Sequence, residues 1–173
     1  MLLFIGLDWC LRRDSRLEHV VLQQLPLLQA WLLERPHVYI VVSADWRRAY
    51  TLKVLRTTFG GPLHERVIGV TEREVLRRNQ PGATVRTGES PRPFAEDLFM
   101  ECCGYPPGER ELEIWLWRNT SDMAHHTWRA LDDRPDLFSP RCKELIEVDG
   151  NLSITAGTIN ALDEWLPPTG SRS

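Results

Sequence analysis

The chain has 173 residues, of which 42% are hydrophobic and 26% charged, and its net charge at pH 7 is -3. This composition is that of an ordinary globular protein of one domain with a sizeable buried core. It excludes a global positive field for nucleic acid, and no apolar stretch is long enough to span a membrane. The N-terminus lacks a signal-peptide pattern, and the four cysteines lack the spacing of a metal knuckle. We therefore expect a cytoplasmic protein with reduced thiols.

The chain opens with a short apolar run, Leu2 to Leu7, which ends in Asp8. Such a run is typical of a buried central strand, and the acid that follows it would lie at the rim of a sheet. Ligands of open α/β sheets bind outside the carboxyl ends of the strands, so Asp8 is the first candidate for chemistry. An Asp that only caps the turn after the strand is the alternative.

Apolar, β-branched runs and helical periodicities then alternate along the chain. Pro26 lies inside the first helical pattern, so we expect a kink or two short helices there. Strands alternating with helices predict a parallel sheet covered on both faces, which is a three-layer α/β/α Rossmann-like fold. The further strands are predicted at 38–42, 67–70, 127–131 and 144–148, and the helices at 20–32, 50–59, 110–118 and 155–166.

Residues 71–108 interrupt this alternation with arginines, glycines and prolines, and only 93–100 is predicted to be helical. We expect a loop or cap-like insertion within a single domain at 1–166, followed by a disordered tail at 167–173. The arginines of the insertion would suit a substrate that carries phosphate. A solvated, mobile loop is the alternative interpretation.

Polar side chains follow three of the predicted strands. Asp8 follows the first, Ser43 the second, and Asp132 with Asp133 a later one. Because parallel strands bring their carboxyl ends to one edge, we expect these groups to converge. Clustered carboxylates repel one another unless a cation lies between them, and Mg²⁺ pairs one or two carboxylates with a phosphate. Arg110 would complete a phosphate cradle with Ser43.

Several segments, in this order and spacing, carry a family resemblance: L-F-I-G-L-D-W-C-L, I-V-V-S-A-D-W-R, R-V-I-G-V-T, R-E-L-E-I-W-L, A-L-D-D-R-P-D-L-F, and L-I-E-V-D with L-S-I-T. The chain resembles the haloacid dehalogenase (HAD) superfamily, and more narrowly the HAD domain of Swiss Army knife RNA-repair proteins and of many stand-alone bacterial proteins. The resemblance implies a magnesium-dependent phosphatase or phosphoryl transferase that forms an aspartyl-phosphate on the first Asp of a D-x-D motif. It also implies phosphate binding by Ser43 and Arg110, with Arg118 as a second candidate cation, and metal binding by Asp132 and Asp133.

The sequence departs from the family at the D-x-D motif. In the register that aligns the first strand and Leu11, the nucleophile position is Gly6. Asp8 then takes the position that acts as general acid/base and gives a backbone carbonyl to the metal, and Trp9 replaces the usual glycine. Glycine cannot attack phosphorus or bind magnesium, so a phosphatase should lose several orders of magnitude in rate. A shifted register would make Asp8 the nucleophile and Cys10 the acid/base, but it loses the match at Leu11.

Three functions follow from this interpretation. The first is a HAD-like pseudoenzyme that keeps the phosphate and magnesium site and acts as a binding or regulatory module for a phosphate-containing molecule. The second is a magnesium-dependent hydrolase of phosphate esters or nucleic-acid phosphodiesters, in which Asp8, Asp132 and Asp133 hold the metal and activate water. The third is binding of a protein partner, because tryptophan is enriched at interfaces and the chain has seven of them.

Overall fold

The computed structural model describes residues 1–6, 25–43, 50–71, 95–150 and 154–167. The chain divides into two compact units. The first comprises residues 1–70, 126–134 and 144–173, and the second comprises 71–125 and 135–143. Asp8, most of the arginine-bearing insertion and the tail after Pro167 lie outside the described residues, so the predictions made for them stay predictions.

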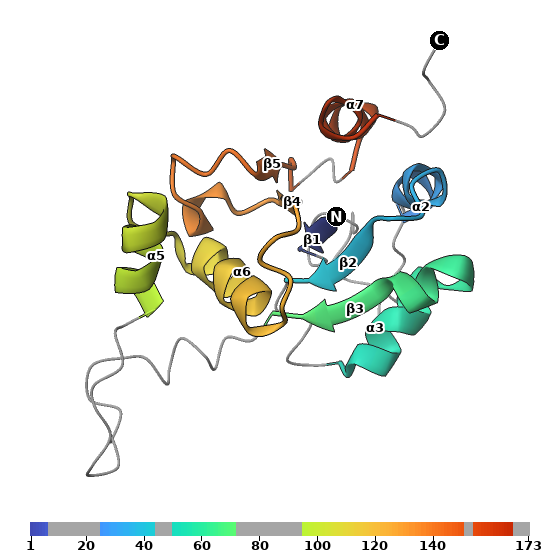
Figure 1. The fold of residues 1–173 in the computed structure, drawn as a ribbon. Helices are drawn as coiled ribbons and strands as arrows, with labels where there is room; N and C mark the ends of the chain where they lie inside the picture. The colour runs from blue at the N-terminus through green and yellow to red at the C-terminus, as the bar shows by residue number, and fades with distance from the viewer. Residues whose placement is uncertain (7–24, 44–49, 72–94, 151–153, 168–173) are drawn as a thin grey trace. The chain divides into compact units, whose positions relative to one another are not determined.

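The first unit is built on a five-stranded sheet in which all strands are parallel (Figure 1). The central strand β1 pairs with β2 on one side and with β4 on the other, as expected for the first strand of a Rossmann-like sheet. Helices flank this sheet, which confirms the predicted α/β fold class. The strands are β1 (Leu2–Ile5), β2 (Tyr39–Val42), β3 (Val67–Val70), β4 (Trp128–Asp132) and β5 (Leu145–Glu147), in the order β3-β2-β1-β4-β5.

Strands β1 and β2 are apolar without interruption because both of their faces are buried. Leu3 and Ile5 pair with Ile40 and Val42, and these four side chains share one face of the sheet. Leu2 and Phe4, which alternate with them, turn to the opposite face and are also fully buried. A parallel strand buried on both faces reads as a continuous hydrophobic run, which is why these strands could be found from the sequence.

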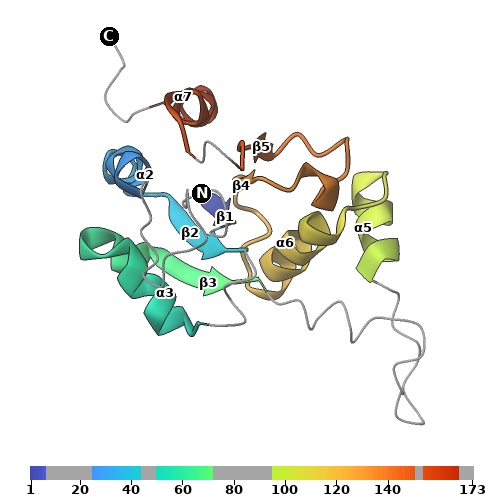
Figure 2. The same cartoon turned by 180° about the vertical axis from the view of Figure 1, so that it is seen from behind.

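The helices of the first unit bury their apolar sides in one cluster with the Leu3 and Ile5 face of the sheet. Figure 2 shows the same helices and the sheet from behind. Leu28 and Leu32 enter this core from the first helix, Phe59 from the second and Leu162 from the last. These elements are α2 (Leu25–Leu33), α3 (Leu52–Phe59), the 3-10 helix η2 (Gly61–Arg66) and α7 (Ala156–Trp165).

A buried arginine fastens α7 to α2. Arg35, which follows α2, is only 1% exposed and forms an ion pair with Asp163 of α7. Its Nε donates to the Leu166 carbonyl at 2.8 Å, and its guanidinium lies 4.4 Å from the ring centre of Trp31. Trp31 in turn stacks on Trp165. The charge is paired and hydrogen-bonded, which is the condition for burying it without a large penalty.

Local sequence signals set the ends of the helices. Pro26 lies in the first turn of α2, where its missing N–H removes no helical hydrogen bond, and the residues before Leu25 are outside the described part of the chain. Gly60 ends α3 with a φ of +60°, a conformation that favours glycine. The Thr155 side chain accepts a hydrogen bond from the Thr158 backbone N–H at 3.3 Å, which confirms the predicted cap of the last helix.

The second unit is a pair of helices, α5 (Ala95–Cys103) and α6 (Glu109–Thr120), with the 3-10 helix η3 (Pro135–Leu137). Phe99 of α5 packs edge-on against Tyr105 and Trp115. Before α6, Gly108 passes so close to η3 that an added Cβ would lie 2.3 Å from the Leu137 carbonyl oxygen. This approach explains why a glycine stands at the start of α6.

Candidate phosphate site

The carboxyl edge of the sheet brings together three residues that follow or end neighbouring strands. Ser43 follows β2, and its backbone N–H donates to the Ile5 carbonyl of β1 at 2.9 Å. Gly6 follows β1, and its N–H donates to the Leu131 carbonyl of β4 at 3.0 Å. Asp132 is the last residue of β4. The structure therefore places Ser43, Gly6 and Asp132 side by side along this edge. The sequence predicted Ser43 and Asp132 at the edge, whereas it put Gly6 inside the first strand and Asp8 at the edge.

Gly6 lies directly against the carboxylate of Asp132. A Cβ added to Gly6 would be 3.1 Å from Asp132 Oδ2 and 3.3 Å from its Cγ. The other oxygen, Oδ1, accepts a hydrogen bond from the Arg134 backbone N–H at 3.0 Å, which holds the side chain in an Asx-type turn. Asp132 is 2% exposed. One carboxylate oxygen is thus held by the local backbone while the other faces a residue without a side chain.

Asp133 turns to the opposite side of β4. A Cβ added to Gly150, just after β5, would lie 3.1 Å from Asp133 Oδ2. The two adjacent acids therefore diverge, and each carboxylate lies so close to a glycine that an added Cβ there would be crowded. Gly150 is not among the site residues predicted from the sequence, although a glycine that follows a predicted strand and an acid can mark a close approach of the backbone.

The described residues contain no group of three or more His, Cys, Asp or Glu side chains that could hold a metal ion. Asp132 and Asp133 supply hard carboxylate oxygens, and Asp8 lies outside the described range. Magnesium is typically bound by only one or two carboxylates together with phosphate and water. Because Asp132 and Asp133 diverge, only one of them would bind a given ion at this edge. Magnesium binding stays a prediction.

Arg110 belongs to the second unit, where it lies in the first turn of α6 and is 8% exposed. Its Nε is 3.7 Å from Glu113 Oε2, one helical turn further on. The hydroxyl of Thr71 is 3.5 Å from the same oxygen of Glu113. Thr71 and Glu113 were missed from the sequence, although an Arg followed by Glu three residues later is the spacing at which helical side chains meet.

Arg118, the second candidate cation, lies on the last turn of α6. It is half-buried, and its guanidinium donates a hydrogen bond to the Ala124 carbonyl in the loop that follows the helix. This contact explains a structural use of Arg118, since cations near a helix C-terminus bind the last carbonyls and the chain beyond them. Arg110 is the more deeply buried of the two.

Glu111 is the second buried acid of the same turn. Its carboxylate accepts hydrogen bonds from the Tyr105 hydroxyl at 2.7 Å, the Gly108 N–H at 3.2 Å and the Ser139 N–H at 3.0 Å. Burial raises the pKa of the Tyr105 hydroxyl, and the hydrogen bond to Glu111 raises it further. These contacts join the segment before α6 to the segment after η3, so Glu111 has a structural role.

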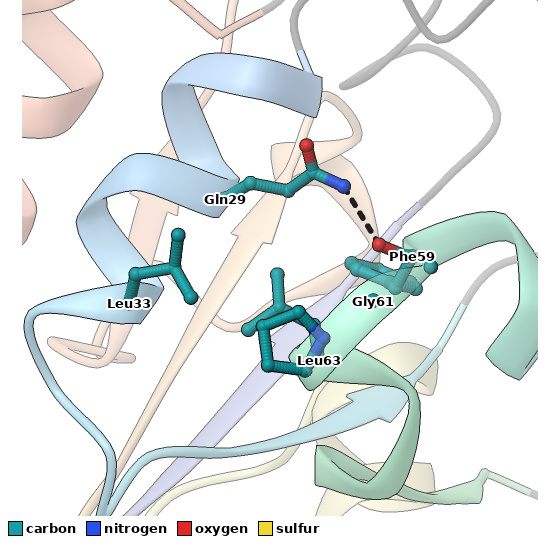
Figure 3. A pocket seen from close by; sticks show the side chains of 7 residues that line it. Gln29, Leu33, Phe59, Gly61 and Leu63 are labelled. Carbon is teal, nitrogen blue, oxygen red and sulfur yellow. Dashed lines mark hydrogen bonds between the residues drawn. The ribbon is translucent and has the colours of Figure 1, made fainter.

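A cavity of about 260 Å³ opens between α2 and the junction of α3 with η2 (Figure 3). Leu33 and Leu63 line it, and Gln29 crosses above it to donate to the Phe59 carbonyl at 2.7 Å. Its lining has no titratable side chain. These residues precede the starts of β2 and β3 in the chain, so the cavity lies toward the amino edge of the sheet, away from the acids.

No helix among the described residues is long and apolar enough to cross a membrane. The family described as the HAD domain in Swiss Army Knife RNA repair proteins matches residues 9–159. No curated protein sequence and no solved structure matches significantly. The matched range includes Ser43, Arg110, Asp132 and Asp133 and begins after Gly6.

Proposed function

We propose that the chain, which belongs to the family of HAD domains in Swiss Army Knife RNA repair proteins, binds phosphate at the carboxyl edge of its sheet without covalent phosphatase chemistry. It acts as a binding or regulatory module. The close approach of Gly6 to Asp132 carries this proposal. Gly6 occupies the position that the sequence register assigns to the nucleophile, and it faces one of the two acids assigned to the metal.

The 3.1 Å distance supports this register in a specific way. Because a Cβ at position 6 would already lie 3.1 Å from Asp132 Oδ2, an aspartate there would bring a second carboxylate near Asp132, and neighbouring carboxylates repel each other unless a cation lies between them. This is the pairing that an aspartyl nucleophile and a metal-binding acid require. With glycine at position 6 the pairing is lost, while the edge that would support it is retained.

The remaining residues can bind and orient a phosphate. In this proposal the Ser43 hydroxyl donates to a phosphate oxygen at the edge of the sheet. Arg110 of the second unit is proposed separately as a residue that binds phosphate, as the resemblance implies. Asp132 or Asp133 would hold magnesium, with Asp8 as a further ligand. Bound there, magnesium would neutralise phosphate charge. No group at position 6 can then accept the phosphoryl group, so the ligand is bound and released unchanged.

The alternative is a hydrolase that uses metal-activated water in place of an aspartyl nucleophile. The fixed orientation of Asp132 favours it, since the Arg134 backbone N–H holds this carboxylate at the edge of the sheet beside Gly6. Members of the superfamily generally use magnesium. The description of the family makes an RNA or another nucleic-acid end the natural substrate class.

A magnesium titration by calorimetry separates these possibilities. The unmodified chain should bind magnesium in the presence of inorganic phosphate, and the Asp132→Asn, Asp133→Asn double variant should not. Glu147→Gln, which alters an exposed acid at the end of β5, is the matched control and should bind as the unmodified chain does. Absence of binding by the unmodified chain would contradict the proposed site.

Assays with a generic phosphate ester and with a phosphorylated RNA end then decide between binding and hydrolysis. If the chain is a binding module, the unmodified chain should show no turnover, and Gly6→Asp should gain magnesium-dependent phosphatase activity. Turnover by the unmodified chain that Asp8→Asn abolishes would overturn the module and favour the hydrolase.

A further inference from the structure

We infer that Glu113 is a positioning residue, which holds the Arg110 guanidinium for an anionic ligand through the contact with its Nε. The inference rests on the proposed phosphate-binding role of Arg110 and extends it to a residue with no other assigned role. It is carried by three side chains of the second unit that are all at least nine-tenths buried: Thr71, Arg110 and Glu113.

The position of Arg110 is unfavourable for the helix itself. It lies in the first turn of α6, where the helix dipole disfavours a positive charge. Burial adds a desolvation penalty, because Arg110 is 8% exposed. Neither the dipole nor burial favours a positive charge here, so the ion pair with Glu113 matters for how the guanidinium is held.

Glu113 has the location and the contacts of a support for this arginine. It is 2% exposed, and its Oε2 is 3.7 Å from Arg110 Nε. The same oxygen is 3.5 Å from the hydroxyl of Thr71, which is fully buried and follows the last residue of β3 in the chain. The carboxylate is thereby restrained from two elements, and it in turn restrains the guanidinium.

The neighbouring Glu111 shows what a purely structural acid in this turn looks like. Its carboxylate is used by the hydroxyl of Tyr105 and by two backbone N–H groups, and its closest contacts include no cation. Glu113 instead contacts a cation and a hydroxyl. The two acids of one helical turn therefore differ in what they hold in place.

The sign of one measurement separates positioning from simple charge compensation. A carboxylate beside Arg110 repels phosphate, so if Glu113 only neutralised the arginine, Glu113→Gln would tighten phosphate binding. If Glu113 positions the guanidinium, the neutral amide holds it less firmly and phosphate binding weakens, by about fivefold or more, because the amide removes the ion pair between the two side chains.

The experiment is a calorimetric titration of inorganic phosphate, with magnesium present, into the full chain and its variants. Glu113→Gln should weaken binding, and it should add nothing in an Arg110→Met background, because Glu113 acts only through Arg110. Glu111→Gln, the matched control, should lower the melting temperature and leave phosphate affinity unchanged. Thr71→Val removes only the hydroxyl that contacts Glu113, and it should weaken phosphate binding by about twofold. If Glu113→Gln does not fold, this variant tests the inference in its place.

Unchanged or tighter phosphate binding by Glu113→Gln overturns the inference and leaves the proposed function standing. An equal loss in the Arg110→Met background overturns it as well, since Glu113 would then act independently of the arginine. If Glu113→Gln does not fold, unchanged binding by Thr71→Val overturns the inference. Absence of phosphate binding by the unmodified chain overturns the proposed function together with the inference.

Discussion

Glu111 in α6 and Asp132 at the end of β4 are equally hidden from solvent, each at 2% exposure, but their surroundings differ. Glu111 is enclosed by three donors from two segments: Tyr105 and Gly108 before α6, and Ser139 after η3. Asp132 is fixed at one oxygen by the backbone two residues ahead, and its other oxygen faces the space that Gly6 leaves.

The difference teaches how to separate an acid that builds the fold from one that belongs to a site. Removing Glu111 leaves buried N–H groups without an acceptor, which costs stability. Removing the charge of Asp132 leaves its local turn possible, because an amide oxygen can accept the same hydrogen bond. Substitution of the structural acid should therefore lower the free energy of unfolding, whereas substitution of the site acid should lower the affinity for the ligand.

The largest expected effect is that of Gly108→Ala. The added Cβ would lie 2.3 Å from the Leu137 carbonyl oxygen and 2.5 Å from Phe138 Cα, and backbone cannot turn away as a side chain can. We expect a loss of about 3 kcal/mol or more in the free energy of unfolding, measured by urea denaturation. Gly157→Ala in α7, whose Cβ would have its nearest contact at 3.5 Å, is the control and should be neutral or stabilising. Equal stability of the two variants would contradict the close packing before α6.

Glu111→Ala tests the structural side of the comparison directly. Because several buried donors lose their acceptor, the free energy of unfolding should fall by about 2 kcal/mol. Magnesium affinity in calorimetry should stay that of the unmodified chain. A variant as stable as the unmodified chain would show that Glu111 is not what joins its three partners.

Tyr105→Phe tests the structural role of Glu111 through the pH dependence of stability. At neutral pH the lost hydrogen bond should cost about 1 kcal/mol. Burial raises the pKa of Tyr105 in the folded chain, so above a pH of about 10 the unfolded chain loses this proton first and the stability of the unmodified chain falls. Phenylalanine has no such proton, and the gap between the two proteins should narrow as the pH rises. Urea denaturation at about pH 8 and above about pH 10 measures it, and a constant gap would argue against the raised pKa.

Asp132→Asn should have the smallest effect on stability, below about 1 kcal/mol, and a large effect on ligand binding. Loss of the carboxylate charge should weaken magnesium binding at least about tenfold in calorimetry, since magnesium prefers anionic oxygen ligands. If the variant were strongly destabilised and its magnesium affinity unchanged, Asp132 would be a structural acid like Glu111, and the proposed difference between the two acids would be wrong.

Much of the fold could be predicted because its signals are local. The buried runs of β1 and β2, the glycine that ends α3 and the threonine that caps α7 each depend on a few adjacent residues. The kink or two short helices predicted at Pro26 stays a prediction, because the residues before Leu25 lie outside the described part of the chain. The prediction of a single domain stays a prediction, because a division into two compact units does not test it.

The sequence by itself determined the order of strands and helices, the polar residues at the strand ends and the family resemblance. Only the tertiary structure decided that Gly6 faces Asp132, that Asp133 turns to Gly150, and that the Thr71 hydroxyl reaches Glu113. Gly6 and Asp132 are more than a hundred positions apart in the sequence, and Asp133 and Gly150 are about seventeen apart. The hydrogen bond of Thr71 to Glu113 joins residues 42 positions apart. Periodicity and capping act over single turns, whereas contacts at these separations depend on how strands pair and which side chains have room.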